Sequence, residues 1–243
     1  MNCRIVGLCG ARPSRATRRV SKLERLILPS SKENDDTFTS LAEGSTDSAA
    51  VKEYYDDWAK DYDQTLDDWE YRTPADAAAL ICPQLSTGNR ILDVGCGTGL
   101  FAAEVRQRIE AEIHGVDISD ASLAIAEKRG CYRGLTQHDL QNLPLPFEDN
   151  SFDGIGCVGV LTYIEDIGGL MKDFCRIVRS GGHIVFTQRD DRWAEKEFDA
   201  HIAQLESEDI WTPLHISEPK PYLPKNKDFA DEIKVIHVLC RVR

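Results

Sequence analysis

One short segment constrains the fold of this 243-residue chain more than any other feature. An apolar, β-prone run over residues 90–94 ends in the turn Asp93-Val94-Gly95-Cys96-Gly97-Thr98-Gly99, and Leu100 then opens an amphipathic helical pattern. Glycines let a chain turn sharply from a strand into a helix, and they let a ligand lie on the backbone amides at the helix N-terminus. The segment therefore predicts a ligand-binding strand–turn–helix unit of an α/β fold.

The chain downstream extends this unit into a sheet. β-prone runs fall at 90–94, 113–117, 133–137, 152–158 and 183–188, and helical periods fall at about 100–110, 120–129 and 167–179, the last ended by Gly181-Gly182. Such alternation is typical of a parallel sheet with crossover helices. We therefore expect one α/β domain with a doubly wound sheet, for which the chain is long enough.

A hairpin is expected to close this sheet. After Arg192 a polar helix runs to about residue 207, and two β-prone runs follow it, Trp211–Ser217 and Lys234–Val242. The proline-rich link at 213–224 between them suits an antiparallel edge hairpin better than another crossover helix.

An aromatic helix is predicted ahead of the sheet. Five residues recur at spacings of three and four and so share one helical stripe: Val51, Tyr54, Tyr55, Trp58 and Tyr62. Thr73 is predicted to cap a second helix that begins with Pro74 and carries Asp76 in its first turn. The stripe suits either a lid over a ligand or ordinary core packing, and the sequence leaves both open.

The N-terminal segment differs in composition from the rest. Residues 1–32 hold eight Lys or Arg residues and one acid, Glu24. This composition resembles an organellar transit peptide, although a disordered basic leader fits it better. We expect residues 1–45 to be leader and linker and residues 46–243 to form the domain, with a helical lid over about 46–86. The expected compartment is the cytosol, with a mitochondrion or another organelle as the alternative.

Charge and composition exclude several classes of partner. The chain carries a net charge of −12, and outside residues 1–32 it holds 21 basic and 40 acidic groups, so a nucleic acid would approach against the field. No apolar run approaches the roughly 18 residues needed to span a bilayer. The cysteines form no C-x-x-C pair and the histidines show no paired ligand spacing, so we expect reduced thiols and no metal.

The spacing around the glycines indicates the ligand. A nicotinamide fingerprint reads G-x-G-x-x-G, whereas this chain reads G-x-G-x-G with Asp93 two residues before the first glycine. A carboxylate there would repel a pyrophosphate but attract an ammonium group, such as that of S-adenosylmethionine. Asp117 ends the next strand and is placed to accept hydrogen bonds from both hydroxyls of a ribose. Asp139, followed by Leu140, is placed to bind adenine or to cap a turn.

Several segments carry a family resemblance. In order they are Asp93–Gly99, Gly115-Val116-Asp117-Ile118-Ser119, His138-Asp139, the Leu-Pro-Phe and Ser-Phe-Asp run at 143–153, and Arg179-Ser180-Gly181-Gly182-His183. Together they resemble class I S-adenosylmethionine-dependent methyltransferases over about residues 88–190. Upstream, residues 55–63 followed by Tyr71-Arg72-Thr73-Pro74 are similar to the methyltransferase-like proteins named after the Williams-Beuren syndrome chromosomal region.

The resemblance implies a fold, a cofactor and a set of binding residues. The fold is a Rossmann-like, mostly parallel seven-stranded sheet with the last strand antiparallel and an N-terminal helix over the cofactor, S-adenosylmethionine. The residues expected to bind this cofactor are Asp93, Gly95, Cys96, Gly97, Thr98, Gly99, Asp117, Ile118, Asp139, Leu140, Cys157, Tyr62, Trp58 and Arg72.

The catalytic residues are not defined by the sequence. Methyl transfer from a sulfonium depends mainly on positioning, and only some acceptors need a base. Where many relatives have a histidine after the fourth strand, this chain reads Leu161-Thr162-Tyr163. Tyr163 and His138 are the nearest candidates for a base, with Asp63 behind them, and each has an ordinary structural role as its alternative.

The sequence thus predicts a methyltransferase that acts on a small-molecule acceptor, with no nucleic acid or membrane partner. Protein methylation is one alternative. Another is a cofactor-binding protein that has kept the fold and lost transfer, and nicotinamide-dependent oxidoreduction is a distant further one.

Overall fold

The computed structural model describes residue 41, residues 44–227, residue 229 and residues 232–243, so the predicted basic leader lies almost entirely outside the described residues. The elements in chain order are α1 (Ser48–Asp68), α2 (Thr73–Ile81), η1 (Cys82–Gln84), β1 (Arg90–Val94), α3 (Leu100–Arg106), β2 (Glu112–Asp117), α4 (Asp120–Arg129), β3 (Gly134–Gln137), β4 (Phe152–Cys157), η2 (Leu161–Tyr163), α5 (Ile167–Ile177), β5 (Val178–Arg189), α6 (Asp190–Trp193), α7 (Phe198–Ser207), β6 (Trp211–Ile216), β7 (Lys220–Pro221) and β8 (Lys234–Val242).

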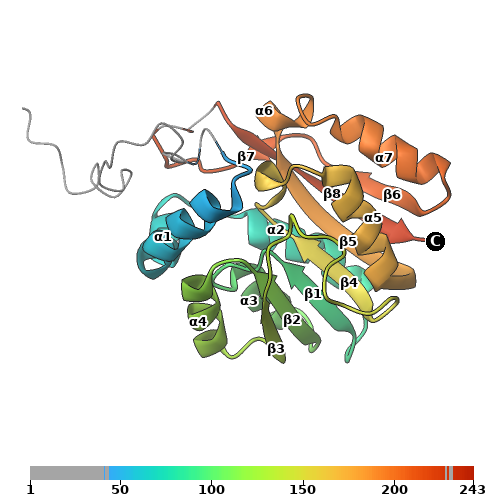
Figure 1. Cartoon of the computed structure of the whole chain (residues 1–243), viewed down its shortest axis with the longest axis horizontal. Coiled ribbons are helices and arrows are strands. Elements are labelled where there is room, and N and C mark those ends of the chain that lie inside the picture. The colour runs from blue at the N-terminus through green and yellow to red at the C-terminus, as the bar shows by residue number, and fades with distance from the viewer. Residues whose placement is uncertain (1–40, 42–43, 228, 230–231) are drawn as a thin grey trace, which may run out of the picture. The chain divides into compact units, whose positions relative to one another are not determined.

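The strands form one sheet in the order β3-β2-β1-β4-β5-β8-β6, with the two-residue β7 also paired to β8 (Figure 1). β8 runs antiparallel to β5 and to β6, and the strands from β3 to β5 are parallel to one another. The predicted seven-stranded doubly wound sheet with an antiparallel last strand is therefore confirmed. The strand order reverses between β1 and β4, and ligands of such sheets bind beyond the carboxyl ends of the strands at that point.

Both faces of the sheet are buried, because neighbouring residues of the central strands point to opposite helix layers. Ile91 of β1 and Ile113 of β2 pack with residues of α2 and α3. Leu92 and Val94 of β1 belong to the cluster on the other face, which α5 and α7 cover. Burial on both faces explains why the strands read as continuous apolar runs.

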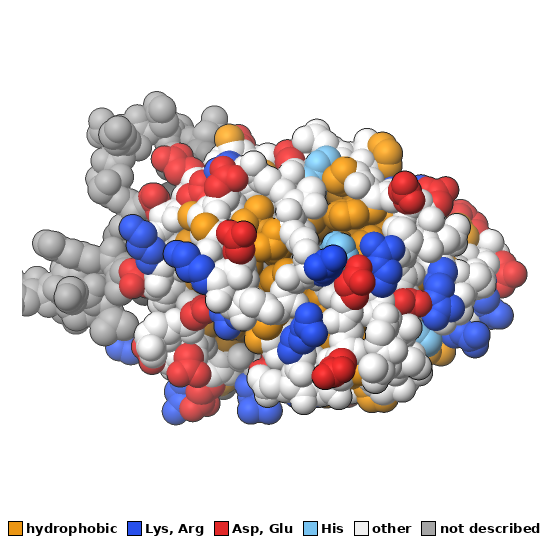
Figure 2. All heavy atoms as spheres, turned by 90° about the horizontal axis from the view of Figure 1, so that it is seen from below, with side chains coloured by type: hydrophobic (Ala, Val, Ile, Leu, Met, Phe, Trp, Pro, Cys, Tyr) orange, Lys and Arg blue, Asp and Glu red, His pale blue; other side chains and the backbone are white. Residues whose placement is uncertain are grey.

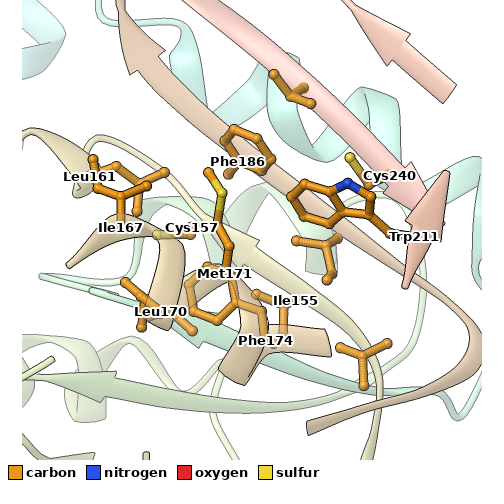
Figure 3. Close-up of a cluster of buried hydrophobic side chains, with 14 of the residues drawn as sticks. Ile155, Cys157, Leu161, Ile167, Leu170, Met171, Phe174, Phe186, Trp211 and Cys240 are labelled. Atoms are coloured by element: carbon orange, nitrogen blue, oxygen red, sulfur yellow. The ribbon is translucent and has the colours of Figure 1, made fainter. Parts of the chain in front are cut away.

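The larger core lies between α5 and the sheet. Figure 3 shows Met171 and Phe174 of α5 beside Ile155 of β4, with Phe186 of β5 and Trp211 of β6 on the far side of the cluster. The Phe186 and Trp211 rings are stacked with their centroids 6.1 Å apart. These contacts fix the carboxyl end of β4, from which one wall of the site is built.

One predicted helix end was wrong. Helix α5 was expected to reach residue 179 and to be ended by Gly181-Gly182, but it ends at Ile177, and Val178 is already extended and pairs with Phe152 of β4. Gly182 lies inside β5, where an added Cβ would be 2.6 Å from the carbonyl oxygen of Asp153. Close strand pairing, and not helix termination, requires a glycine there.

Three further boundaries differ from the predictions. Thr73 is the first residue of α2 and not its cap, because Arg72 occupies the cap position without a side-chain bond. The helix expected over about 100–110 ends at Arg106. The polar helix expected up to 207 is two helices, α6 and α7, and Glu197, with φ +51°, breaks the helical path ahead of α7.

The surface is mixed in charge on the face shown in Figure 2, where Lys and Arg side chains alternate with Asp and Glu around a band of apolar atoms. Within the described part of the chain, every helix is too short or too polar to cross a lipid bilayer. In the same part, no group of three or more His, Cys, Asp or Glu side chains is placed to hold a metal ion.

Candidate functional site

The turn after β1 carries the site, and its three glycines face different neighbours. All three have positive φ, at +66° for Gly95, +51° for Gly97 and +94° for Gly99. A Cβ on Gly95 would be 2.3 Å from Val160, and a Cβ on Gly99 would be 3.0 Å from the Tyr132 ring, whereas nothing lies within 4 Å of a Cβ on Gly97. Gly97 is thus the position where the bare backbone faces open space.

Asp117 ties the turn to the next crossover. One of its carboxylate oxygens accepts a hydrogen bond from the Gly97 amide at 2.7 Å, and the other accepts from the Ser119 amide at 2.9 Å. Burial raises the pKa of this carboxyl, while the backbone hydrogen bonds act against that shift. Each oxygen keeps a further lone pair, so the carboxylate can still accept hydrogen bonds from the hydroxyl groups of a ligand in the cavity that it lines.

Asp93 is the most deeply buried acid of the site, with 1% of its surface exposed. The Tyr132 hydroxyl donates to its Oδ2 at 2.6 Å. Burial raises the pKa of this carboxyl to about 7, although the hydrogen bond from Tyr132 opposes the shift. A buried carboxyl in this state gains most from a cationic partner, because such a partner would hold it ionised.

Two adjoining cavities lie at this edge of the sheet. The larger encloses about 730 Å³, part of it open to solvent, and the smaller encloses about 330 Å³. Asp117, Ile118, Asp139 and Leu140 line the larger cavity, and Asp93 lines the smaller one. Four residues line both cavities and mark their junction: Tyr62, Gly95, Gly97 and Val158. The larger cavity is lined mainly by apolar and aromatic side chains with a few polar groups among them, as small-molecule sites are.

Helix α1 covers the site from the side of α4, beside which it packs (Figure 1). Asp56 of α1 accepts hydrogen bonds from the Ser119 hydroxyl at 2.6 Å and from the Ala121 amide at 3.2 Å. Further along α1, Asp63 accepts a hydrogen bond from the Thr98 hydroxyl at 2.5 Å and pairs with Arg129. We name these contacts the α1 latch, since they attach the helix to the same segments that carry Asp117 and the glycine turn.

The aromatic stripe of α1 divides between cavity wall and packing. Tyr55 and Tyr62 line the larger cavity, and the Tyr55 hydroxyl donates to the Tyr163 hydroxyl at 3.0 Å. Trp58 instead packs beside Tyr62 and Trp69, with ring centroids 4.7 Å and 6.0 Å away. The lid and core interpretations of the stripe are therefore compatible, because different residues of it serve each purpose.

Most of the predicted cofactor-binding residues come together here. Ten of them line the two cavities: Tyr62, Asp93, Gly95, Cys96, Gly97, Thr98, Asp117, Ile118, Asp139 and Leu140. Four do not line either cavity, namely Gly99, Cys157, Trp58 and Arg72. Cys157 is buried in the core and Arg72 is exposed at the start of α2.

The two candidate bases lie in different surroundings. Tyr163 lines the larger cavity, and burial raises the pKa of its phenol, so the group stays protonated at neutral pH and can donate a hydrogen bond. His138 is half-buried, and its Nε2 lies 2.8 Å from the carbonyl oxygen of Asn142, outside the cavity walls. Asp63, the third candidate, is engaged in the α1 latch.

Sequence reasoning missed several residues of the site, among them Tyr132 and Gln141. Tyr132 precedes β3 in an unremarkable polar stretch, and only the folded sheet brings its hydroxyl to Asp93. Gln141 lines the larger cavity and donates to the backbone oxygens of Thr46 and Tyr163, both at 3.0 Å. No spacing rule connects these partners, because they lie up to 95 residues apart.

Comparison with known proteins agrees with this geometry. Residues 92–186 match the family model described as a methyltransferase domain. Human methyltransferase-like protein 27 is 32% identical over 179 residues, which cover 71% of this chain and 73% of that protein. A ubiquinone biosynthesis O-methyltransferase from Alkalilimnicola ehrlichii is 36% identical over 107 residues, 41% of each protein.

The fold also matches solved structures. A crystal structure from Thermotoga maritima, described as an S-adenosylmethionine-dependent methyltransferase and possible histamine N-methyltransferase, superposes with a TM-score of 0.58. The match covers 79% of this chain and all of that one at 16% identity, so it bears on the fold alone.

Proposed function

This chain belongs to the class I S-adenosylmethionine-dependent methyltransferases, and on that premise we propose that it methylates a small-molecule acceptor at the junction of the two cavities. S-adenosylmethionine is its methyl donor. We also propose that the chain is related to the methyltransferase-like proteins named after the Williams-Beuren syndrome chromosomal region, which residues 55–63 resemble.

The residues at the carboxyl edge fit this cofactor. We propose that Asp93 in the smaller cavity receives the ammonium group, and that Asp117 in the larger cavity receives the ribose hydroxyls. Asp139 and Leu140 lie further along the larger cavity, where an adenine would be bound by a polar edge and an apolar face. Asp93 and Asp117 line different cavities, and the bare Gly97 backbone lines both, which is the observation that carries this proposal.

The sulfonium would then lie at the junction lined by Tyr62, Gly95, Gly97 and Val158. The cofactor supplies an electrophilic methyl group, and the chain's own residues position the partners and exclude water. The Tyr62 ring is the aromatic surface at this junction, and an aromatic face stabilises a nearby cation by about 0.5–2 kcal/mol.

The acceptor has the rest of the larger cavity available. Tyr55 and Tyr163 form a hydrogen-bonded pair in its wall, and Gly159 and Val160 continue that wall after β4. Tyr163 can donate a hydrogen bond to an acceptor and orient it, whereas its raised pKa argues against a role as a base. The ubiquinone biosynthesis O-methyltransferase among the relatives supports a small-molecule acceptor.

Transfer of a labelled methyl group tests the proposal. The protein is incubated with radiolabelled S-adenosylmethionine and a metabolite extract, and the small-molecule and protein fractions are counted separately. We expect label in the small-molecule fraction, and much less of it with the Gly97→Ala variant at a limiting cofactor concentration. Label confined to the protein fraction would favour protein methylation. Cofactor binding without any transfer would favour the non-catalytic alternative.

The compartment is also a proposal. The six cysteines within the described residues are free thiols, which supports the reducing environment of the cytosol. Fluorescence microscopy of the full chain, with and without residues 1–32, tests this against import into an organelle.

A further inference from the structure

The Tyr132 ring occupies space that is free because Gly115 and Gly99 have no side chains. Its ring carbons lie 2.9 Å from where a Cβ of Gly115 on β2 would be, and 3.0 Å from where a Cβ of Gly99 in the turn would be. Real Cβ atoms essentially never approach a carbon so closely, so any side chain at Gly115 would displace the ring. The bare backbone at two separate elements therefore accommodates this one tyrosine.

The position of the ring brings its hydroxyl to the Asp93 carboxylate, with the Cys96 thiol also close to it. The Tyr132 hydroxyl donates to Asp93 Oδ2 at 2.6 Å, a distance typical of a charge-assisted bond between a hydroxyl and a carboxylate. Tyr132 itself lines neither cavity, whereas Asp93 lines the smaller one. Of its two neighbours in that cavity, Asp93 and Cys96, Asp93 is the acid, so it is the group through which Tyr132 would act on a cationic part of a ligand.

We propose that Tyr132 is a positioning residue that holds Asp93 for the ammonium group of the cofactor and so makes the site select nucleosides that carry an amino acid group. This inference rests on the cofactor placement proposed above. Without the hydroxyl, the carboxylate would lose its orientation toward the smaller cavity, and only ligand groups that reach that cavity would be affected.

Two nucleosides separate this role from a general structural one. S-adenosylhomocysteine carries the amino acid group, and 5′-methylthioadenosine has the same nucleoside and thioether without it. In the Tyr132→Phe variant we expect calorimetry to show roughly tenfold weaker binding of S-adenosylhomocysteine, as for a hydrogen bond to a charged group. The dissociation constant of 5′-methylthioadenosine should change by less than about twofold, since no partner of that ligand is altered.

A second variant tests whether the effect passes through the carboxylate. In an Asp93→Asn background, Tyr132→Phe should produce no further loss of S-adenosylhomocysteine affinity, because the charged group that it positions is gone. Additive losses would show that Tyr132 acts by another route and would overturn the inference.

The pH dependence of binding gives a third readout. The charged or titratable groups around Asp93 are Tyr132, Cys96 in the turn, Asp117 on β2 and Cys157 on β4. Because the Tyr132 hydrogen bond lowers the pKa of Asp93, its removal should move the loss of S-adenosylhomocysteine binding on acidification to a higher pH.

The outcomes are distinct. Equal weakening of the binding of both nucleosides by Tyr132→Phe would assign the tyrosine a general structural role. Unchanged binding of both would show that the tyrosine has no role in binding. Either result overturns the inference while the cofactor site stands. If the wild-type protein binds neither nucleoside, the cofactor site itself is refuted and the inference falls with it.

Discussion

At the scale of single residues, Gly88 is a control for Gly97, because the two glycines have similar backbone conformations and open surroundings but only Gly97 lines the cavities. Both have positive φ, at +51° and +84°, and nothing lies within 4 Å of a Cβ on either. Gly97 lies at the carboxyl end of β1 and lines both cavities, whereas Gly88 precedes the strand at its opposite end.

We expect Gly97→Ala and Gly88→Ala each to lower the free energy of unfolding by about 1 kcal/mol, since an alanine in this backbone region is strained. Only Gly97→Ala should weaken S-adenosylhomocysteine binding, by tenfold or more, because its methyl group would fill ligand space. Chemical denaturation and calorimetry measure the two effects. Equal binding losses in both variants would contradict the assignment of Gly97 to the ligand.

Asp93 gives a prediction for the protein without ligand. Burial raises its pKa from 3.8 to about 7, so its contribution to stability is present below pH 4 and is lost as the pH rises to 7. The Asp93→Asn variant lacks this loss. Its stability relative to the wild type should therefore rise by about 4 kcal/mol between pH 4 and pH 8. A difference in unfolding free energy between the two proteins that stays constant across that range would contradict the raised pKa of a buried Asp93 carboxyl.

The sequence predicted these residues more readily than their neighbours. The glycines and Asp93 were recognised because a fixed spacing after a strand signals them. Gly99, however, was expected to face a ligand and faces Tyr132 instead. That difference depends on the direction of each missing Cβ, which spacing along the chain does not specify.

At the scale of elements, α1 is attached to the domain by few buried side chains. Its buried residues are Val51, Ala59 and Leu66, and the α1 latch supplies the polar contacts to α4 and the turn. Since few buried side chains imply low local stability, we expect this helix to open more readily than the central strands. Its opening would give a ligand access to the cavity that it covers.

Proteolysis tests whether the cofactor closes this helix. Cleavage between residues 45 and 72 should slow sharply when S-adenosylmethionine is added, because α1 contributes Tyr55 and Tyr62 to the cavity wall. An unchanged cutting rate would remove the lid interpretation and leave α1 as ordinary packing.

A matched pair of variants tests the latch. Asp56→Asn weakens the contacts to Ser119 and Ala121, and in the free protein it should raise the cleavage rate about tenfold, as expected for lost hydrogen bonds to a charged group. Asp68→Asn alters a carboxylate of the same helix that is bonded within the helix to Gln64, so it should leave the rate nearly unchanged. Equal rates for both variants would contradict the latch.

The aromatic stripe predicted α1 itself, but not the latch. Periodicity identifies which residues share a helical face, and the α1 helix follows from it. The partners of Asp56 and Asp63 across the fold lie at the two ends of α4 and in the glycine turn, and only the assembled sheet brings those segments to α1. The end of α5 escaped prediction for a similar reason, because pairing of Val178 with Phe152 decides it.

At the scale of the whole molecule, the alternation of strands and helices predicted a doubly wound sheet, and the family resemblance supplied its seven strands and antiparallel last strand. The strand order places the carboxyl ends of β1, β2 and β4 side by side, and these ends carry Asp93, Asp117 and the wall at Val158. The site thus exists only as a product of the topology, since its parts come from segments more than 60 residues apart.

The most direct test of this account is a calorimetric titration of the folded protein with S-adenosylhomocysteine, with NAD as the comparison ligand. We predict saturable binding of S-adenosylhomocysteine with one site per chain and no measurable binding of NAD, because Asp93 favours an ammonium group and repels a pyrophosphate. The absence of heat with S-adenosylhomocysteine, in protein shown to be folded, would contradict the central claim.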